Sequence, residues 1–231
     1  GDVYKRQMPM YDYGSVDETG DLSYNAQGAQ NWGYDPENYN VPEGSYSSDP
    51  SDPASRVTEM KQMVKGLHEN DIRVIMDVVY NHVYNAANHS FNKTVPGYYF
   101  RYDDNGSLVN NSGCGNDTAS ERKMMRKYIV DSVTYWAKNY NVDGFRFDLM
   151  GLIDTETMKE VRAALDEIDP SIIILGEGWD MNTTMDEGEM TIQPNAYQVA
   201  SDGTNNGIAF FNDSVRDGLK GSAVYYTHLT L

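Results

Sequence analysis

The sequence predicts an α/β protein built on a parallel β-sheet. Two observations support this prediction. Amphipathic helical patterns alternate with short strand-like segments along the chain, as in βαβ units. The strand-like segments are also almost continuously apolar, which is typical of strands covered on both faces. A length of 231 residues is enough for one large domain, so we expect a single domain.

The composition excludes several classes of protein. Hydrophobic residues make up 39% and charged residues 23% of the chain, which excludes a disordered protein, and no apolar run is long enough for a membrane span. The net charge of -17 argues against nucleic acid as a partner, because that partner requires clustered Lys and Arg. Cys114 is the only cysteine, so an internal disulfide is impossible.

Both ends of the chain differ from the pattern of a natural protein. Residues 1–7 and 223–231 resemble translated adapter sequence, and neither residues 1–7 nor a start at Met8 has the organisation of a signal peptide. We therefore expect residues 8–222 to be an internal piece of a larger protein, which we call the parent protein. Its cellular location is left open.

The first half of the chain contains one clear helix and one clear strand. Residues 8–54 are rich in Tyr, Asn, Gly, Asp and Pro and are expected to form loops with short turns. Apolar residues at helical spacing from Ser55 predict a helix that ends near Asn70. The apolar run over residues 72–79 predicts a strand, after which the chain becomes polar at His82.

A long connection over residues 83–117 precedes the second helix. The segment Thr118-Ala119-Ser120-Glu121 matches a capping box, so a helix is expected from Thr118 to about Tyr140. The remaining segments are predicted strands at 142–147, 172–175 and 208–211, and predicted helices at 158–168 and 213–219.

Three consecutive predicted strands are followed by a chemically active side chain: His82, Asp148 and Glu177. In parallel α/β proteins the chemistry collects at the carboxyl ends of the strands. Arg146 lies two residues before Asp148, so both side chains project from the same face of their strand. An arginine beside an aspartate favours the charged carboxylate. A buried structural ion pair is the alternative for Arg146 and Asp148 alone, but three such endings in register favour a site.

These residues are suited to glycoside hydrolysis. The chain has no phosphate-binding glycine motif and no GxSxG nucleophile elbow. Two carboxylates can instead act as a nucleophile and a proton donor at a sugar's anomeric centre. Neighbouring strands lie about 4.8 Å apart, which is compatible with the carboxylate separation of about 5 to 5.5 Å in retaining enzymes.

Several motifs resemble those of a known enzyme family. The segments DVVYNH (77–82), GFRFD (144–148) and GEGW (176–179) resemble three of the four signature regions of the α-amylase superfamily. Three further segments are similar to type I pullulanases: NWGYDP (31–36), NYNVPEGSY (38–46) and GCGNDTASE (113–121). The resemblance implies part of a TIM (β/α)8 barrel, comprising about strands 3 to 6 and the loop after strand 2.

The resemblance also implies a role for each site residue. Asp148 would be the nucleophile, Glu177 the general acid/base, and Arg146 the cation that keeps Asp148 ionised. The other implied residues contact or support the sugar: His82 by hydrogen bonding, Tyr34 by stacking, Trp179 at the neighbouring sugar, Trp32 as a further aromatic face, and Asn81 at the strand end. No metal ligand and no cofactor is implied, although calcium in the parent protein stays open.

The implied substrate is an α-glucan polysaccharide or oligosaccharide, with no nucleic acid or membrane as partner. The implied reaction is cleavage of α-1,6-glucosidic bonds in pullulan, amylopectin and limit dextrins with retention. One alternative is an isoamylase-like or other α-amylase-superfamily hydrolase, and another is a non-catalytic carbohydrate-binding barrel. The family's fourth region, a His-Asp pair, is not found in the sequence, so we expect the 231-residue chain alone to be inactive.

Overall fold

The computed structural model describes residues 3–23, 31–181, 183–203 and 206–220. Its central feature is a five-stranded sheet with the order β1-β4-β5-β6-β7, in which every neighbouring pair is parallel. The strands are β1 (Val3–Gln7), β4 (Ile72–Val78), β5 (Gly144–Phe147), β6 (Ile173–Gly176) and β7 (Ala209–Phe210). The predicted α/β class with a parallel sheet is confirmed.

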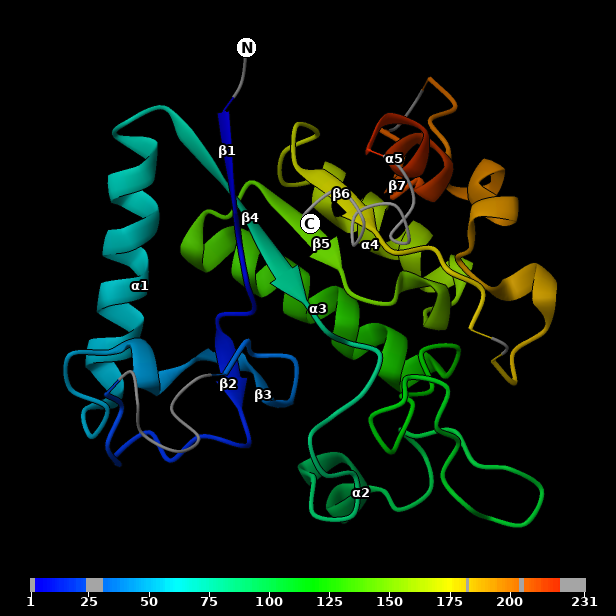
Figure 1. Ribbon diagram of the computed structural model, residues 1–231, viewed down its shortest axis with the longest axis horizontal. Helices are drawn as coiled ribbons and strands as arrows, with labels where there is room; N and C mark the ends of the chain where they lie inside the picture. Colours follow the sequence, from blue (N-terminus) through cyan, green and yellow to red (C-terminus); the bar gives the residue numbers. More distant parts are fainter. Residues whose placement is uncertain (1–2, 24–30, 182, 204–205, 221–231) are drawn as a thin grey trace, which may run out of the picture.

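The sheet contains one strand that the sequence did not predict. β1 pairs with β4 in the register Val3↔Ile72 to Gln7↔Met76, and in Figure 1 this edge strand passes in front of β4. The adapter origin expected for residues 1–7 concerns where the sequence comes from, and it stays a prediction. The tail over residues 223–231 lies outside the described residues.

Helices follow the strands in the predicted order. The longer ones are α1 (Pro53–His68), α3 (Lys123–Tyr140), α4 (Thr155–Asp166) and α5 (Asp213–Lys220), and α2 (Ser90–Thr94) is a single short turn. α1 packs on β4 and α3 packs on α4, and α3 lies behind the sheet in Figure 1. Short 3-10 helices are η1 (Gly44–Tyr46), η2 (Met150–Leu152), η3 (Glu187–Glu189) and η4 (Gln193–Val199).

The loop expected over residues 8–54 is wrong in part. β2 (Tyr11–Tyr13) and β3 (Pro36–Pro42) form an antiparallel pair with irregular register. Tyr11 and Tyr39 are fully buried there, with ring centroids 5.5 Å apart. Tyrosine-rich composition suggested surface loops, but the rings fill the core while the hydroxyls bond to backbone groups, with Tyr39 donating to the His82 carbonyl.

The capping box is also wrong. α3 begins at Lys123, and its N-cap residue Arg122 makes no side-chain capping bond. Thr118 instead donates from Oγ1 to the Tyr80 carbonyl at 2.5 Å, and Glu121 pairs with Arg101 at 2.8 Å. Partners distant in the sequence therefore occupy the side chains that the local motif assigned to the first helical turn.

A continuous apolar core lies between the sheet and the helices. Its largest fully buried side chains include Trp136, Phe145, Phe147 and Met76. None of the helices in the described part of the chain combines the length and apolarity needed to cross a membrane.

Candidate active site

The site lies at the carboxyl ends of β4, β5 and β6. Asp77 and Arg146 are register partners on adjacent strands. Asp148 and Glu177 come directly after β5 and β6, where the Asp148 N–H donates to the Val78 carbonyl at 2.9 Å and the Glu177 N–H to the Phe147 carbonyl at 3.1 Å. The sheet's own hydrogen-bond ladder thus places both carboxylates at one edge, as predicted.

Arg146 connects the carboxylates. Its Nη1 lies 2.8 Å from Asp77 Oδ1 and 2.8 Å from Asp148 Oδ1, and its Nη2 forms an ion pair with Glu177 Oε1. Arg146 is only 5% exposed. Burial disfavours the charged guanidinium, but the nearby carboxylates outweigh this effect and raise the pKa of Arg146 above its ordinary value. The guanidinium therefore stays charged at the centre of the site.

Asp77 occupies the most buried position in this group, with no exposed surface. Burial raises the pKa of its carboxyl group, and the charge of Arg146 opposes that shift. Tyr34 donates from its hydroxyl to Asp77 Oδ2 at 2.9 Å, so Tyr34 is tied to the strand end. Burial likewise raises the pKa of the Tyr34 hydroxyl.

Asn81 and His82, which follow β4, bond to Asp148, to each other and to Tyr34. Asn81 donates from Nδ2 to the Asp148 carbonyl at 2.8 Å and to Asp148 Oδ2 at 3.0 Å. His82 lies 2.6 Å by Nδ1 from Asn81 Oδ1 and 2.9 Å by Nε2 from the Tyr34 carbonyl. Burial lowers the pKa of His82, while the Tyr34 carbonyl and the Asp148 charge act in the opposite direction. Asn81 is therefore bonded to the predicted nucleophile, which is more than the strand-end role expected for it.

The two tryptophans that were predicted to contact sugar, Trp32 and Trp179, differ in position. Trp179 lines a pocket of about 420 Å³ together with Arg146, Glu177 and Phe211, so the structure brings it to Glu177. Trp32 is 72% exposed, and no contact with the carboxylates is found among the described residues. The role of Trp32 in binding sugar stays a prediction.

Sequence reasoning missed two neighbours of the carboxylates. The Phe211 ring lies 5.6 Å from the Arg146 guanidinium carbon, and the Leu149 N–H donates to Glu177 Oε2 at 3.2 Å. Phe211 comes directly after β7, so the strand-end rule that found His82, Asp148 and Glu177 could have found it. Leu149 acts through its backbone, which no residue pattern signals.

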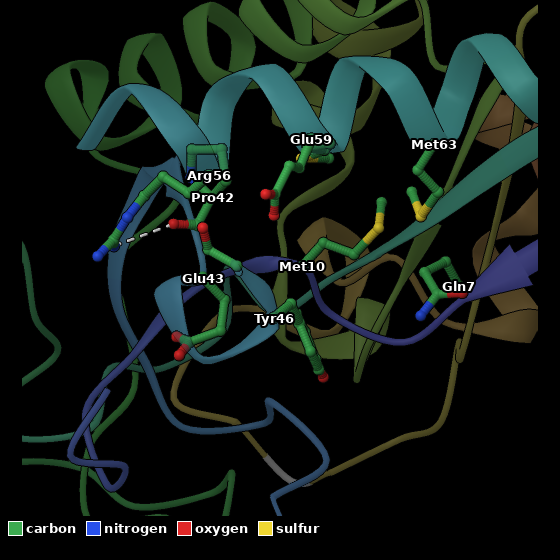
Figure 2. Close-up of a pocket in the computed structure, with 10 residues that line it drawn as sticks. Gln7, Met10, Pro42, Glu43, Tyr46, Arg56, Glu59 and Met63 are labelled. Atoms are coloured by element: carbon green, nitrogen blue, oxygen red, sulfur yellow. Dashed lines mark hydrogen bonds between the residues drawn. The ribbon is translucent and has the colours of Figure 1, made fainter. Parts of the chain in front are cut away.

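A second pocket, of about 250 Å³, lies between α1 and the β2–β3 region and is shown in Figure 2. Its Glu43 side chain accepts from the N–H groups of Tyr13 and Ser45 and therefore serves the local backbone. Glu43 also belongs to an acidic cluster with Asp12 and Glu18. Arg56 pairs with Glu18, and burial raises the pKa of Asp12 to about 6, so both effects reduce the negative charge of this cluster.

The pair of carboxylates at the ends of adjacent strands is suited to one class of enzyme, the glycoside hydrolases, which act with two Asp or Glu residues. Comparisons with known proteins narrow this class. No family model matches the chain. The chain is 45% identical to a pullulanase of Bacillus subtilis (strain 168) over 97% of its own length.

Solved structures agree. A pullulanase of Paenibacillus barengoltzii, crystallised with maltohexaose and alpha-cyclodextrin, superposes with a TM-score of 0.88 and 50% identity over 95% of this chain. In sequence, by contrast, a rice isoamylase 3 matches only 53% of the chain, at 38% identity. The predicted resemblance to pullulanases is confirmed: over nearly its whole length, the chain corresponds to one part of pullulanase sequences and structures. It spans 30% of the Bacillus relative and 33% of the Paenibacillus chain.

Proposed function

We propose that the parent protein is a debranching glycoside hydrolase that cleaves α-1,6-glucosidic linkages in pullulan, amylopectin and limit dextrins. The observation that carries the proposal is that Arg146 contacts both Asp148 and Glu177 at the ends of adjacent strands. A guanidinium shared by both carboxylates is compatible with the short separation of retaining enzymes. The five parallel strands fit a partial (β/α)8 barrel, which is part of the proposal.

The proposed reaction proceeds in two displacements. Asp148 attacks the anomeric carbon and forms a glycosyl ester, while Glu177 gives its proton to the departing O6 oxygen of the next glucose. Glu177 then removes a proton from water, the resulting hydroxyl bonds to the anomeric carbon, and the ester bond to Asp148 breaks. Two inversions at one carbon retain its configuration, and Glu177 ends protonated as it began.

The remaining residues would bind and support the sugar. Arg146 stabilises the ionised Asp148, and Asn81 orients that carboxylate through its amide. His82, Tyr34 and Trp179 would contact the sugars flanking the cleaved bond, with Trp32 as an outer platform. The aspartate that the family supplies from its fourth region is not found in this sequence, so the activity is proposed for the parent protein.

Product analysis of the parent protein tests the proposal. Pullulan should yield mainly maltotriose, unbranched amylose should react poorly, and the released sugar should first appear as the α-anomer in proton NMR spectra. Panose, isopanose or random α-1,4 products would assign the protein to another branch of the superfamily. Pullulan binding without any product would indicate the carbohydrate-binding alternative.

A further inference from the structure

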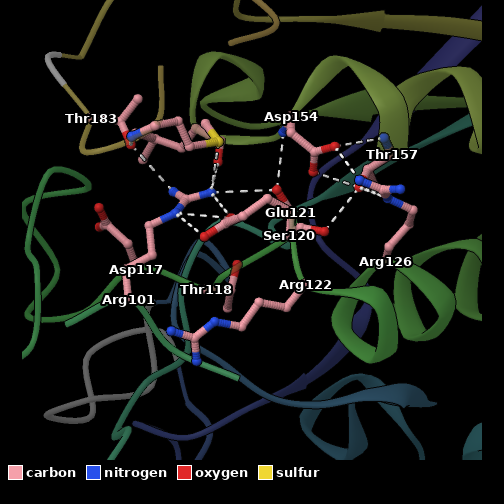
Figure 3. A network of polar contacts seen from close by, with 12 residues as sticks. Arg101, Asp117, Thr118, Ser120, Glu121, Arg122, Arg126, Asp154, Thr157 and Thr183 are labelled. Carbon is pink, nitrogen blue, oxygen red and sulfur yellow. Dashed lines mark hydrogen bonds and ion pairs between the residues drawn. The ribbon is translucent and has the colours of Figure 1, made fainter. Parts of the chain in front are cut away.

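A second buried arginine, Arg101, lies in the long loop between β4 and α3 and is only 2% exposed. Its guanidinium donates to Glu121 from Nε at 3.1 Å and from Nη2 at 2.8 Å. The same Nη2 lies 3.0 Å from the Leu152 carbonyl oxygen. Figure 3 shows this group of polar side chains. Glu121 thus orients a guanidinium that holds a backbone carbonyl of another loop.

The loop that Arg101 holds leads back to the proposed acid. Leu152 belongs to the turn directly after Asp148, and the first residue of that turn, Leu149, donates its N–H to Glu177 Oε2 at 3.2 Å. Gly151 donates its N–H to the Glu177 carbonyl at 3.0 Å. A Cβ at Gly151 would lie 1.9 Å from the Trp179 carbonyl oxygen. The turn therefore fits closely against the backbone of Glu177 and Trp179.

The turn needs external support because Leu149 has a left-handed backbone, with φ of 41° and ψ of 50°. A non-glycine residue in that region is strained and persists only where its surroundings impose it. The far end of the turn is held by Arg101 at Leu152 and by Ser120, whose Oγ accepts from the Asp154 N–H at 3.0 Å. Both anchors come from the same loop.

Arg101 also reaches the loop that follows Glu177. Its Nη1 lies 3.5 Å from Thr183 Oγ1, and its Nη2 lies 3.1 Å from Met185 Sδ. One guanidinium therefore touches the loops on both sides of the proposed acid, the one after β5 and the one after β6. Removing it would free both at once.

We propose that Arg101 is a positioning residue for Glu177, acting through the Leu152 carbonyl and the strained Leu149 turn. This rests on the proposed role of Glu177 as proton donor. The side chain of Arg101 contacts neither carboxylate of the site. In the formation of the glycosyl ester, its effect should therefore appear only with a leaving group that needs a proton from Glu177.

The test compares two substrates of the parent protein that differ in their leaving group. Cleavage of pullulan requires protonation of a sugar oxygen, whereas α-maltosyl fluoride releases fluoride with little help from an acid. A small displacement of a catalytic group can cost about 100-fold in rate. Because hydrolysis of the glycosyl ester also needs Glu177 and contributes to kcat for both substrates, the comparison uses kcat/KM, which reports formation of the ester. In Arg101→Met we expect kcat/KM on pullulan to fall about 10- to 100-fold, and kcat/KM on the fluoride to stay within about threefold.

Arg162→Met is the matched control. Arg162 is also buried, donates to a backbone carbonyl, that of Ile172, at 2.7 Å, and pairs with Asp166 at 2.7 Å. It serves the opposite end of β6, away from Glu177. This variant should lower the melting temperature, as Arg101→Met does, and leave the ratio of the two rates unchanged.

Glu121→Gln provides a milder variant if Arg101→Met does not fold, since the Glu121 side chain is 32% exposed. It should reduce pullulan cleavage several-fold and spare the fluoride. Equal losses on both substrates, or no loss on pullulan, would overturn the positioning role. If the unmodified parent protein cleaves another α-glucan instead of pullulan, the linkage proposal fails, and the same rate ratio measured with that glucan still decides the role of Arg101.

Discussion

Two buried arginines, Arg146 and Arg101, organise two neighbouring regions of this molecule in different ways. Arg146 has three carboxylate partners on three strand ends and lines an open pocket. Arg101 has one carboxylate partner, and its other contacts are a carbonyl, two hydroxyls and a sulfur. Among the described residues, Arg146 Nε has no hydrogen-bond partner, whereas every nitrogen of the Arg101 guanidinium donates.

The difference shows that burial of an arginine does not by itself mark a catalytic site. The region around Arg101 is balanced in charge and satisfied in hydrogen bonds, which is what a structural clamp requires. Arg146 and its three carboxylate partners form a cluster with more carboxylates than cations. A cluster of like charges is costly to the fold, and it is characteristic of sites that do chemistry.

The largest expected effect is on catalytic activity, and it comes from replacing the carboxylates beside Arg146. In the parent protein, Asp148→Asn or Glu177→Gln should reduce pullulan hydrolysis by about 1,000-fold or more, because each removes a reacting group. The exposed Asp131→Asn is the control and should change nothing. Release of reducing sugar measures the rate, and near-normal release from either site variant would refute the assigned roles.

A second prediction separates the arginines by stability. Arg146→Met leaves three carboxylates without their cation and should lower the free energy of unfolding by about 3 to 5 kcal/mol. Arg101→Met leaves only the partly exposed Glu121, so about 1 to 3 kcal/mol is expected. Guanidinium denaturation of the parent protein measures both. Equal losses would contradict the difference in charge balance between the two regions.

A third prediction concerns how stability depends on pH through His89, a histidine near the Arg101 region. His89 accepts from the Phe91 N–H at Nδ1, its Nε2 lies 2.7 Å from the Glu37 carbonyl oxygen, and its ring lies 6.3 Å from that of Phe100, which precedes Arg101. Burial lowers the pKa of His89 below its ordinary value of 6.5. The unfolded chain therefore binds the proton more readily, so stability should be complete above about pH 6.5 and decrease as the pH falls below it.

Replacing this histidine checks the assignment. His89→Gln should flatten the dependence of the unfolding free energy on pH between about 6.5 and 5. His82, whose pKa burial also lowers, still titrates in that variant and should leave a residual slope. An unchanged slope in His89→Gln would show that the folded state binds the proton at this site as readily as the unfolded chain.

The smallest expected effect comes from an ion pair that belongs to neither region. Lys127 and Asp131 lie one helical turn apart on α3, with side chains 58% and 61% exposed. Water and salt screen such pairs, so Lys127→Ala should cost at most about 0.5 kcal/mol. Thermal melting at low and high salt measures it. A loss as large as that of Arg101→Met would mean that exposure does not separate these pairs.

Local pattern in the sequence determined the parallel sheet and the main catalytic candidates. The strands at 72–78, 144–147 and 173–176 are apolar runs, and a strand's two-residue repeat places Arg146 and Asp148 on one face. The position of Glu177 follows because parallel strands end at the same edge of a sheet. Each of these inferences uses residues that are close together in the chain.

Tertiary structure alone decided what depends on distant partners. Arg101 is 51 residues from Leu152 and 84 from Met185, and the Leu149 contact uses a backbone N–H that every residue type except proline possesses. Thr118 and Glu121 fit a helix cap by local rule, yet Thr118 bonds to the Tyr80 carbonyl and Glu121 pairs with Arg101 instead. A polar side chain bonds to the partner that the folded chain places beside it, and a short-range sequence pattern cannot predict a partner that is distant in the chain.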